Sequence, residues 1–122
     1  EDWADGPLAM FVWMQNHPEE TRSVVSSLGM EDLQIFLHKQ LRAVMEPIVD
    51  QHSIDLRVTE DDRVFVTDHF TLAILGHISQ WLATGMSTDP YILTERIARV
   101  LDGQVRRSLE LFASSPHPPA RA

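Results

Sequence analysis

The chain contains no cysteine, a single lysine and a single tyrosine, and only 7% of its residues are aromatic. The absence of cysteine excludes a disulfide framework and a thiolate metal site, and it fits a reducing cytoplasm, where we expect the protein. Basic residues are fewer than acidic ones. The chain has 10 lysines and arginines and 18 aspartates and glutamates, so its formal net charge is −8. Phosphate binding needs clustered lysine and arginine, so these residues are not expected to contact nucleic acid themselves.

The longest stretch that is almost free of charge lies in the second half of the chain. The segment DHFTLAILGHISQWLATGM, residues 68–86, has a single formal charge, at Asp68. It has about the length needed to cross a membrane, but His69, His77 and Gln80 make it a poor membrane span. A buried helix in a soluble domain is the better interpretation. A chain of 122 residues with 43% hydrophobic content is expected to form one such domain.

The uncharged segment carries two apolar faces when its residues are placed about 100° apart around a helix. The first face is expected to hold Val66, Phe70, Ala73, Ile74, His77 and Trp81. The second is expected to hold Leu72, Leu75, Gly76, Ser79, Leu82, Ala83 and Met86. A helix that is apolar on two sides is buried on two sides, so one face meets the core and the other a second copy. The small residues of the second face allow close helix packing, and the sequence therefore predicts a homodimer.

Five helices and no strand are expected, over about residues 5–15, 18–28, 31–50, 60–85 and 90–112. Thr59 and Asp89 have side chains that cap helix N-termini, and Gly85 is suited to end a helix. Pro47 lies inside the third helix and should kink it or end its regular part. Residues 51–59 alternate like a short strand, but a strand without a partner is unstable, so we expect a loop.

The last expected helix has an apolar arc broad enough to pack on the central helix and on a symmetry mate at once. Gly103 weakens it locally, by up to about 1 kcal/mol relative to alanine. Residues 1–113 are expected to form the folded domain, and the proline-rich residues 114–122 a disordered tail.

The segment HFTLAILGHISQWLATGMSTDPYILTERIARVL resembles the C-terminal domain of TetR-type bacterial transcription regulators. In that family, a helix with a phenylalanine, a central glycine and a Trp-Leu pair runs to a Gly-Met turn. An Asp-Pro or Ser-Pro cap and a last amphipathic helix follow. The corresponding positions here are Phe70, Gly76, Trp81, Leu82, Gly85, Met86, Asp89 and Pro90.

The resemblance implies an all-α, five-helix bundle whose last two helices form a four-helix dimer interface. It also implies a TetR-like repressor in which an N-terminal helix-turn-helix reads DNA and the C-terminal helices bind a small, often apolar effector. This sequence lacks the helix-turn-helix, so we expect a truncated or proteolysed fragment that meets DNA only through the missing domain. The expected dimer interface contains Leu72, Leu75, Gly76, Ser79, Leu82, Ile97, Leu101 and Val105.

The effector site implied by the family is expected between the first, third and central helices. Its candidate residues are Trp13, Met14, Phe36, Met45, Phe70, Ile74 and His77, with Leu37 and Phe65 as further lining residues. Taken singly, each of these residues is more often part of ordinary core packing than a ligand contact. His77 is expected on the core face, where it offers one hydrogen bond in an apolar cavity. Effector binding would shift the population of two arrangements and change the spacing of two recognition helices, which must match one turn of DNA, near 34 Å.

Neither a metal site, nor a cofactor, nor an enzyme is expected. His69 and His77 share a helix side but lie two turns, or about 12 Å, apart, and no pair of histidines is spaced by four residues. The acids of residues 60–62 are expected to form a solvated first helical turn. The alternative function, from another class, is a helical protein-interaction or dimerisation module without a ligand or a DNA role.

Overall fold

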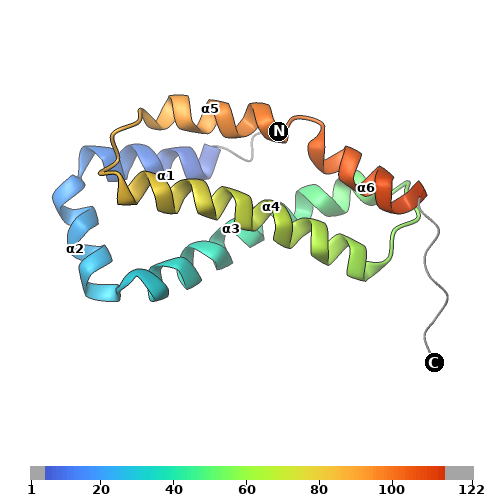
Figure 1. The fold of residues 1–122 in the computed structure, drawn as a ribbon, viewed down its shortest axis with the longest axis horizontal. Coiled ribbons are helices and arrows are strands. Elements are labelled where there is room, and N and C mark those ends of the chain that lie inside the picture. Colours follow the sequence, from blue (N-terminus) through green and yellow to red (C-terminus); the bar gives the residue numbers. More distant parts are fainter. Residues whose placement is uncertain (1–4, 115–122) are drawn as a thin grey trace.

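The computed structural model describes residues 5–114, with side chains from Leu8 onward. This part of the chain forms α1 (Asp5–Asn16), α2 (Pro18–Leu28), α3 (Met30–Ser53), α4 (Glu60–Ala83), α5 (Pro90–Leu101) and α6 (Gln104–Ser114). No strand occurs among the described residues, and the all-α class is confirmed. Figure 1 shows an elongated arrangement in which α5 lies beside α1, while α6 packs against α3 and α4 at the other end.

Hydrogen bonds confirm the predicted caps of α4 and α5, including that of α5, where the Asp89 carboxylate accepts the Tyr91 N–H at 2.8 Å. The Thr59 hydroxyl accepts the Asp62 N–H at 3.0 Å, and the Asp62 carboxylate accepts the Thr59 N–H, which completes a capping box. The α4 helix ends at Ala83, and Gly85 follows at φ 78°. The Met86 N–H donates to the Trp81 carbonyl and the Gly85 N–H to the Leu82 carbonyl. This pair of bonds is a Schellman motif, which glycine permits because it has no Cβ.

The last predicted helix is two helices, which corrects the expected count. Asp102 leaves the helical conformation with ψ 116°, and Gly103 follows at φ 75°, in the left-handed region that glycine adopts readily. The break separates the packing partners, since α5 packs mainly on α1 whereas α6 packs on α3 and α4. The broad apolar arc expected for one helix is thus divided between two.

The α3 helix is longer than expected at its C-terminal end. It continues past Pro47 to Ser53, so the proline does not end it. The predicted loop is therefore confined to residues 54–59. Its first residues are joined to α3 by the Leu56 N–H, which donates to the Ser53 carbonyl at 3.0 Å.

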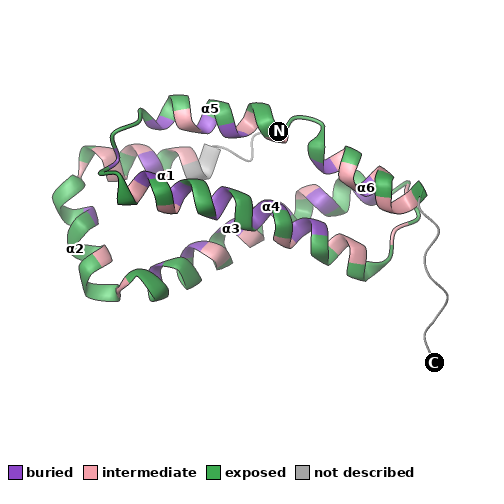
Figure 2. Ribbon diagram, viewed as in Figure 1, coloured by how far each residue is buried: buried purple, intermediate pink, exposed green. Residues whose placement is uncertain are grey.

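The core lies between α3 and α4, whose pairing is the most extensive between any two helices, and it is closed by α1, α5 and α6 (Figure 2). The fully or almost fully buried hydrophobic residues are Phe11, Leu33, Leu37, Leu41, Met45, Val49, Val66, Phe70, Ile74, Leu75, Ile78, Trp81, Met86, Ile97, Val105 and Leu109. Phe11 of α1 contacts Trp81 of α4 with 5.5 Å between the ring centroids, and this contact anchors α1 near the C-terminal end of α4.

No helix within residues 5–114 combines the length and the apolar character required to cross a membrane. The predicted tail, residues 114–122, lies outside the described residues except for Ser114, which ends α6.

Candidate functional site

One side of α4 is exposed and carries almost no charge. The α4 strip, as we name it, consists of residues spaced alternately four and three apart, namely Phe65, His69, Leu72, Gly76, Ser79 and Ala83. Ser79 is partly buried and the others are exposed, with Phe65 at 62% and Leu72 at 57% of their full accessible area. No acidic or basic residue other than histidine occurs between Asp68 and Asp89. A solvent-facing helix side normally carries charges, so the α4 strip has the character of a contact surface.

Aromatic side chains extend the α4 strip toward α6. The Phe65 ring lies edge-on to the ring of Phe112 at 6.3 Å and stacks on His69 at 6.4 Å between centroids. Leu111, the residue before Phe112, is half exposed. The start of α4 and the end of α6 therefore present one continuous apolar area.

The middle of the α4 strip is open to close approach. A Cβ atom built on Gly76 has no neighbouring heavy atom within 4 Å apart from its own helix and chain neighbours. The α4 backbone is accessible at Gly76. Another helix can therefore approach it more closely here than at a position with a larger side chain.

Some of the residues expected at the dimer interface are accessible in the single chain, and others are buried in its core. Leu72 and Gly76 are exposed, and Ser79, Leu82 and Leu101 are partly buried. The other three, Leu75, Ile97 and Val105, are buried within the single chain. Phe65 and His69 were not among the expected interface residues. The spacing 65, 69, 72, 76, 79, 83 is the sequence signal that would have included them.

The residues expected at the effector site also separate into two groups. Met45, Phe70 and Ile74 are buried in the core shared by α3 and α4, and Met14 of α1 packs against that core. Trp13, Phe36 and His77 are exposed. Of the further lining residues, Leu37 is buried and Phe65 belongs to the α4 strip.

His77 does not lie on the core face, and that part of the expectation is wrong. It lines an open pocket of about 340 Å³ together with Gln80, Trp81, Thr84, Ser87, Thr88 and Leu93. The lining is mostly polar, and Trp81 uses its Nε1–H to donate to the Thr88 carbonyl at 2.8 Å. Ala73, also expected on the core face, is exposed.

Trp13 lines a different pocket, between α1 and the first turn of α5. Its volume is about 470 Å³, and its lining residues are Leu8, Ala9, Val12, Trp13, Asn16, His17 and Tyr91. Trp13 was predicted in a cavity between the first, third and central helices, and Tyr91 was not among the predicted site residues. The sequence contains no local signal that joins these positions, because α1 and α5 meet only through the tertiary fold.

A family model of the TetR type, described as the transcriptional regulator C-terminal region, matches residues 1–103. The chain belongs to this family of regulators. Searches among curated proteins and among solved structures found no match. Membership confirms the resemblance inferred from the second half of the sequence and extends it to the N-terminal residues. It identifies the chain as a TetR regulatory domain.

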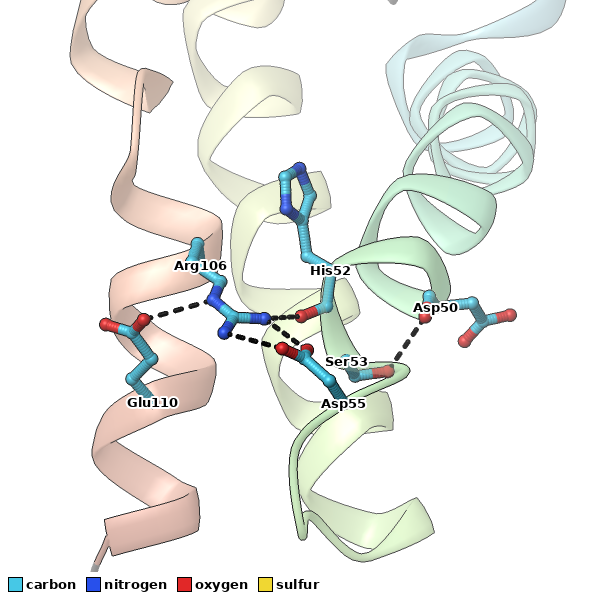
Figure 3. Close-up of polar contacts among 6 residues, drawn as sticks. All are labelled: Asp50, His52, Ser53, Asp55, Arg106 and Glu110. Atoms are coloured by element: carbon cyan, nitrogen blue, oxygen red, sulfur yellow. Dashed lines mark hydrogen bonds and ion pairs between the residues drawn. The ribbon is translucent and has the colours of Figure 1, made fainter.

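The match to the TetR regulatory domain ends at Gly103, so α6 follows the matched region. Arg106 of α6 bonds to the C-terminal end of α3 and to the loop that follows it, as Figure 3 shows. Arg106 Nη1 donates to the His52 carbonyl and to Asp55 Oδ1, both at 2.7 Å, and Nη2 donates to Asp55 Oδ2 at 3.2 Å. Its Nε donates to Glu110 at 3.0 Å within α6. We name this group the Arg106 clamp.

The Arg106 clamp changes the electrostatics of the residues it joins. The hydrogen bond from Arg106 lowers the pKa of Asp55 below its ordinary value of 3.8, and a backbone hydrogen bond acts in the same direction. The bonds to Asp55 and Glu110 raise the pKa of Arg106. A second interhelix ion pair joins α3 to α4, where Arg42 Nε donates to Asp68 Oδ1 at 2.9 Å.

The described residues of this TetR domain contain no cluster of three or more histidine, aspartate and glutamate side chains arranged to hold a metal ion. What the arrangement offers is an apolar core, an uncharged exposed helix side and two open pockets of about 340 and 470 Å³. These are features of binding and association.

Proposed function

We propose that this chain is the effector-sensing and dimerisation domain of a TetR-type repressor, which acts as a homodimer in the cytoplasm. The intact protein would bind its operator through an N-terminal helix-turn-helix. The observation that carries the proposal is the exposed, uncharged α4 strip on a chain with a formal net charge of −8. Family membership supports this function over the alternative, an interaction module without a ligand or DNA role.

The proposed dimer pairs the α4 strip with the same strip of a second copy. Pairing by a two-fold axis brings each strip against itself, and an uncharged strip does so without like-charge repulsion. Val100 of α5 and Leu111 of α6 are exposed apolar residues that would contribute from the last helices. The result would be a four-helix interface in which Gly76 lies where the two α4 helices approach most closely.

We place the proposed effector site in the core between α3 and α4, around Met45, Phe70 and Ile74, with Met14 of α1 packed against that core. These residues carry no formal charge, which suits a small apolar molecule. Two methionines supply flexible side chains that can adapt to the shape of a ligand. Trp13, Phe36 and His77 are exposed and lie outside this proposed site.

The α1 helix is the element through which an effector would act. It is coupled to α4 by the Phe11–Trp81 contact, and the Gln15 side-chain amide lies 3.5 Å from the Met86 and Thr88 carbonyls of the α4–α5 turn. A ligand that separates α3 from α4 would therefore displace α1, which precedes the rest of the domain. We propose that this displacement alters the spacing of the two recognition helices in the dimer. That spacing must match one turn of DNA, about 34 Å, so a shift of a few ångströms would release the operator.

Sedimentation velocity over a concentration series tests the proposed dimer. We expect the 122-residue chain to sediment as a dimer at micromolar concentration, and Gly76→Leu to sediment as a monomer. Leucine has space in the single chain because nothing lies within 4 Å of the built Cβ, and it favours the helix more than glycine does. The added side chain would block only the close approach of the partner helix.

Ala43→Leu is the matched control, since it adds a larger side chain at an exposed position of α3 outside the α4 strip. It should sediment as the unaltered chain does. A monomeric unaltered chain, or a Gly76→Leu variant that dimerises equally well, would refute the interface.

A further inference from the structure

The pocket between α1 and α5 is an open hollow on the surface, lined largely by apolar and aromatic side chains. Its volume of about 470 Å³ falls within the range of ligand pockets, roughly 300–1,000 Å³. It lies on the outer side of α1, with Tyr91 as its contribution from α5. It is separate from the proposed effector site, because Met45, Phe70 and Ile74 are absent from its lining.

Two exposed aromatic side chains dominate this pocket. Trp13 keeps 48% and Tyr91 keeps 61% of its accessible area, although both are large rings that gain from burial. Tyr91 is the only tyrosine of the chain, and Trp13 one of 3 tryptophans, so both types are scarce. Leu8, Ala9 and Val12 add apolar surface from α1. Aromatic and apolar surface left open to water in a hollow favours a flat apolar ligand.

His17 gives the pocket a fixed polar group. Its ring stacks on Trp13 with 4.3 Å between centroids and 13° between planes, and its Nδ1 lies 2.8 Å from the Trp13 carbonyl oxygen. A carbonyl only accepts, so Nδ1 must carry the proton, and the Nε2 of the neutral ring is left as an acceptor. The Thr21 hydroxyl donates to the His17 carbonyl at 2.8 Å, which holds the backbone at this turn.

Among the side chains that the structure describes, from Leu8 onward, no acid, lysine or arginine lines the pocket. Asp89, which lies two residues before Tyr91, has its carboxylate occupied as the cap of α5, where it accepts the Tyr91 N–H at 2.8 Å. An ionised ligand would thus lose water without gaining a counter-charge, which is costly. The described part of the lining therefore favours an uncharged molecule.

We propose that the α1–α5 pocket binds a small, planar, uncharged aromatic molecule that carries an N–H or O–H donor. The ring packs against Trp13 and Tyr91, and the donor is directed to Nε2 of His17. This site is additional to the proposed effector site and does not depend on the proposed dimer.

Indole is a suitable probe because it is planar, uncharged and has one N–H donor. We would titrate the 122-residue chain with indole and follow the backbone amide signals of α1 and of the start of α5 by NMR. N-methylindole keeps the ring but lacks the donor. We expect both to shift these signals in a saturable manner, and N-methylindole to bind up to about tenfold more weakly, the effect of one lost hydrogen bond.

Trp13→Ala and Tyr91→Ala should each weaken indole binding by about tenfold or more, since each removes one aromatic wall. Both side chains are about half exposed, so the variants should stay folded. Phe36→Ala is the matched control, because it removes an aromatic ring exposed to 51% on α3, away from this pocket. It should bind indole as the unaltered chain does.

Shifts that fail to saturate would refute the site. So would unchanged binding to the Trp13→Ala and Tyr91→Ala variants, or an equal loss in Phe36→Ala. The Gly76→Leu variant distinguishes this proposal from the preceding one, because it should lose the dimer and keep indole binding.

Discussion

Phe70 is one of two aromatic side chains, with Trp81, that α4 places in the core. It is buried, whereas the neighbouring residue, His69, is exposed and meets Phe70 edge-on at 5.1 Å between ring centroids. A large buried side chain contributes by removal of apolar area from water and by close packing. Its truncation leaves a cavity that the helices fill only in part.

Phe70→Ala is therefore expected to lower the free energy of unfolding by about 3–5 kcal/mol, measured by urea denaturation. Phe36→Ala makes the same chemical change at an exposed position of α3 and should alter stability by only about 0.5 kcal/mol. Equal effects of the two substitutions would place Phe70 outside the core.

Threonines explain why the buried side of α4 differs from the expected one. Thr67 and Thr71 are buried, and their hydroxyls donate to the carbonyls of Arg63 and Thr67 at 2.8 and 2.7 Å. Because these bonds within the helix satisfy the hydroxyls, the residues can enter the core despite their polarity. A pattern based on apolar residues alone omits them. It therefore rotates the buried side toward His77, which is exposed.

At the scale of the element, α6 depends on a few side chains for its place. Val105 and Leu109 enter the core, and the Arg106 clamp fixes the helix to the end of α3 and to Asp55. The arginine presents two nitrogen atoms to the two carboxylate oxygens, a geometry that a lysine cannot provide. Gly103 ends the preceding helix and lets α6 take its own direction.

The lowered pKa of Asp55 predicts a pH dependence of stability. Its folded-state pKa lies below the ordinary value of 3.8, so its contribution is present above that value and is lost as the pH falls through the folded-state pKa. We expect the unaltered chain to exceed Asp55→Asn in free energy of unfolding at pH 7. The difference should shrink at pH 3, as measured by urea denaturation at both values.

Asp50→Asn is the matched control, since Asp50 lies nearby but its carboxylate is turned away from Arg106 (Figure 3). Its difference from the unaltered chain should change less between the two pH values. A difference for Asp55→Asn that is equal at pH 7 and pH 3 would mean that the clamp does not depend on the Asp55 charge.

At the scale of the whole molecule, folding and association are expected to be linked. The single chain leaves Phe65 and Leu72 of the α4 strip more than half exposed. A second copy that covers this strip would bind only the folded state, and it would stabilise that state by mass action.

The melting temperature of the unaltered chain should therefore rise with protein concentration over a hundredfold range, as measured by calorimetry. That of Gly76→Leu should stay constant, since the variant is expected to fold without pairing. A melting temperature independent of concentration in the unaltered chain would be evidence against a dimer linked to folding.

The sequence alone determined where most helices begin and end, because these features depend on neighbouring residues. Thr59, Gly85 and Asp89 mark helix ends because caps and left-handed turns depend on a residue and its near neighbours. The uncharged segment marks the central helix for the same reason, since its period and composition are local. The family could also be recognised from that segment and the turn after it.

Only the tertiary structure decided which sides of the helices are covered. The positions of Leu75, Ile97 and Val105 in the core, and the exposure of His77 and Trp13, depend on helices distant in sequence. Trp13 and Tyr91 line one pocket, and Arg106 binds Asp55, although each pair joins segments that are distant in the sequence. A helical period states which residues share a side, whereas the packing of the other helices decides which side faces inward.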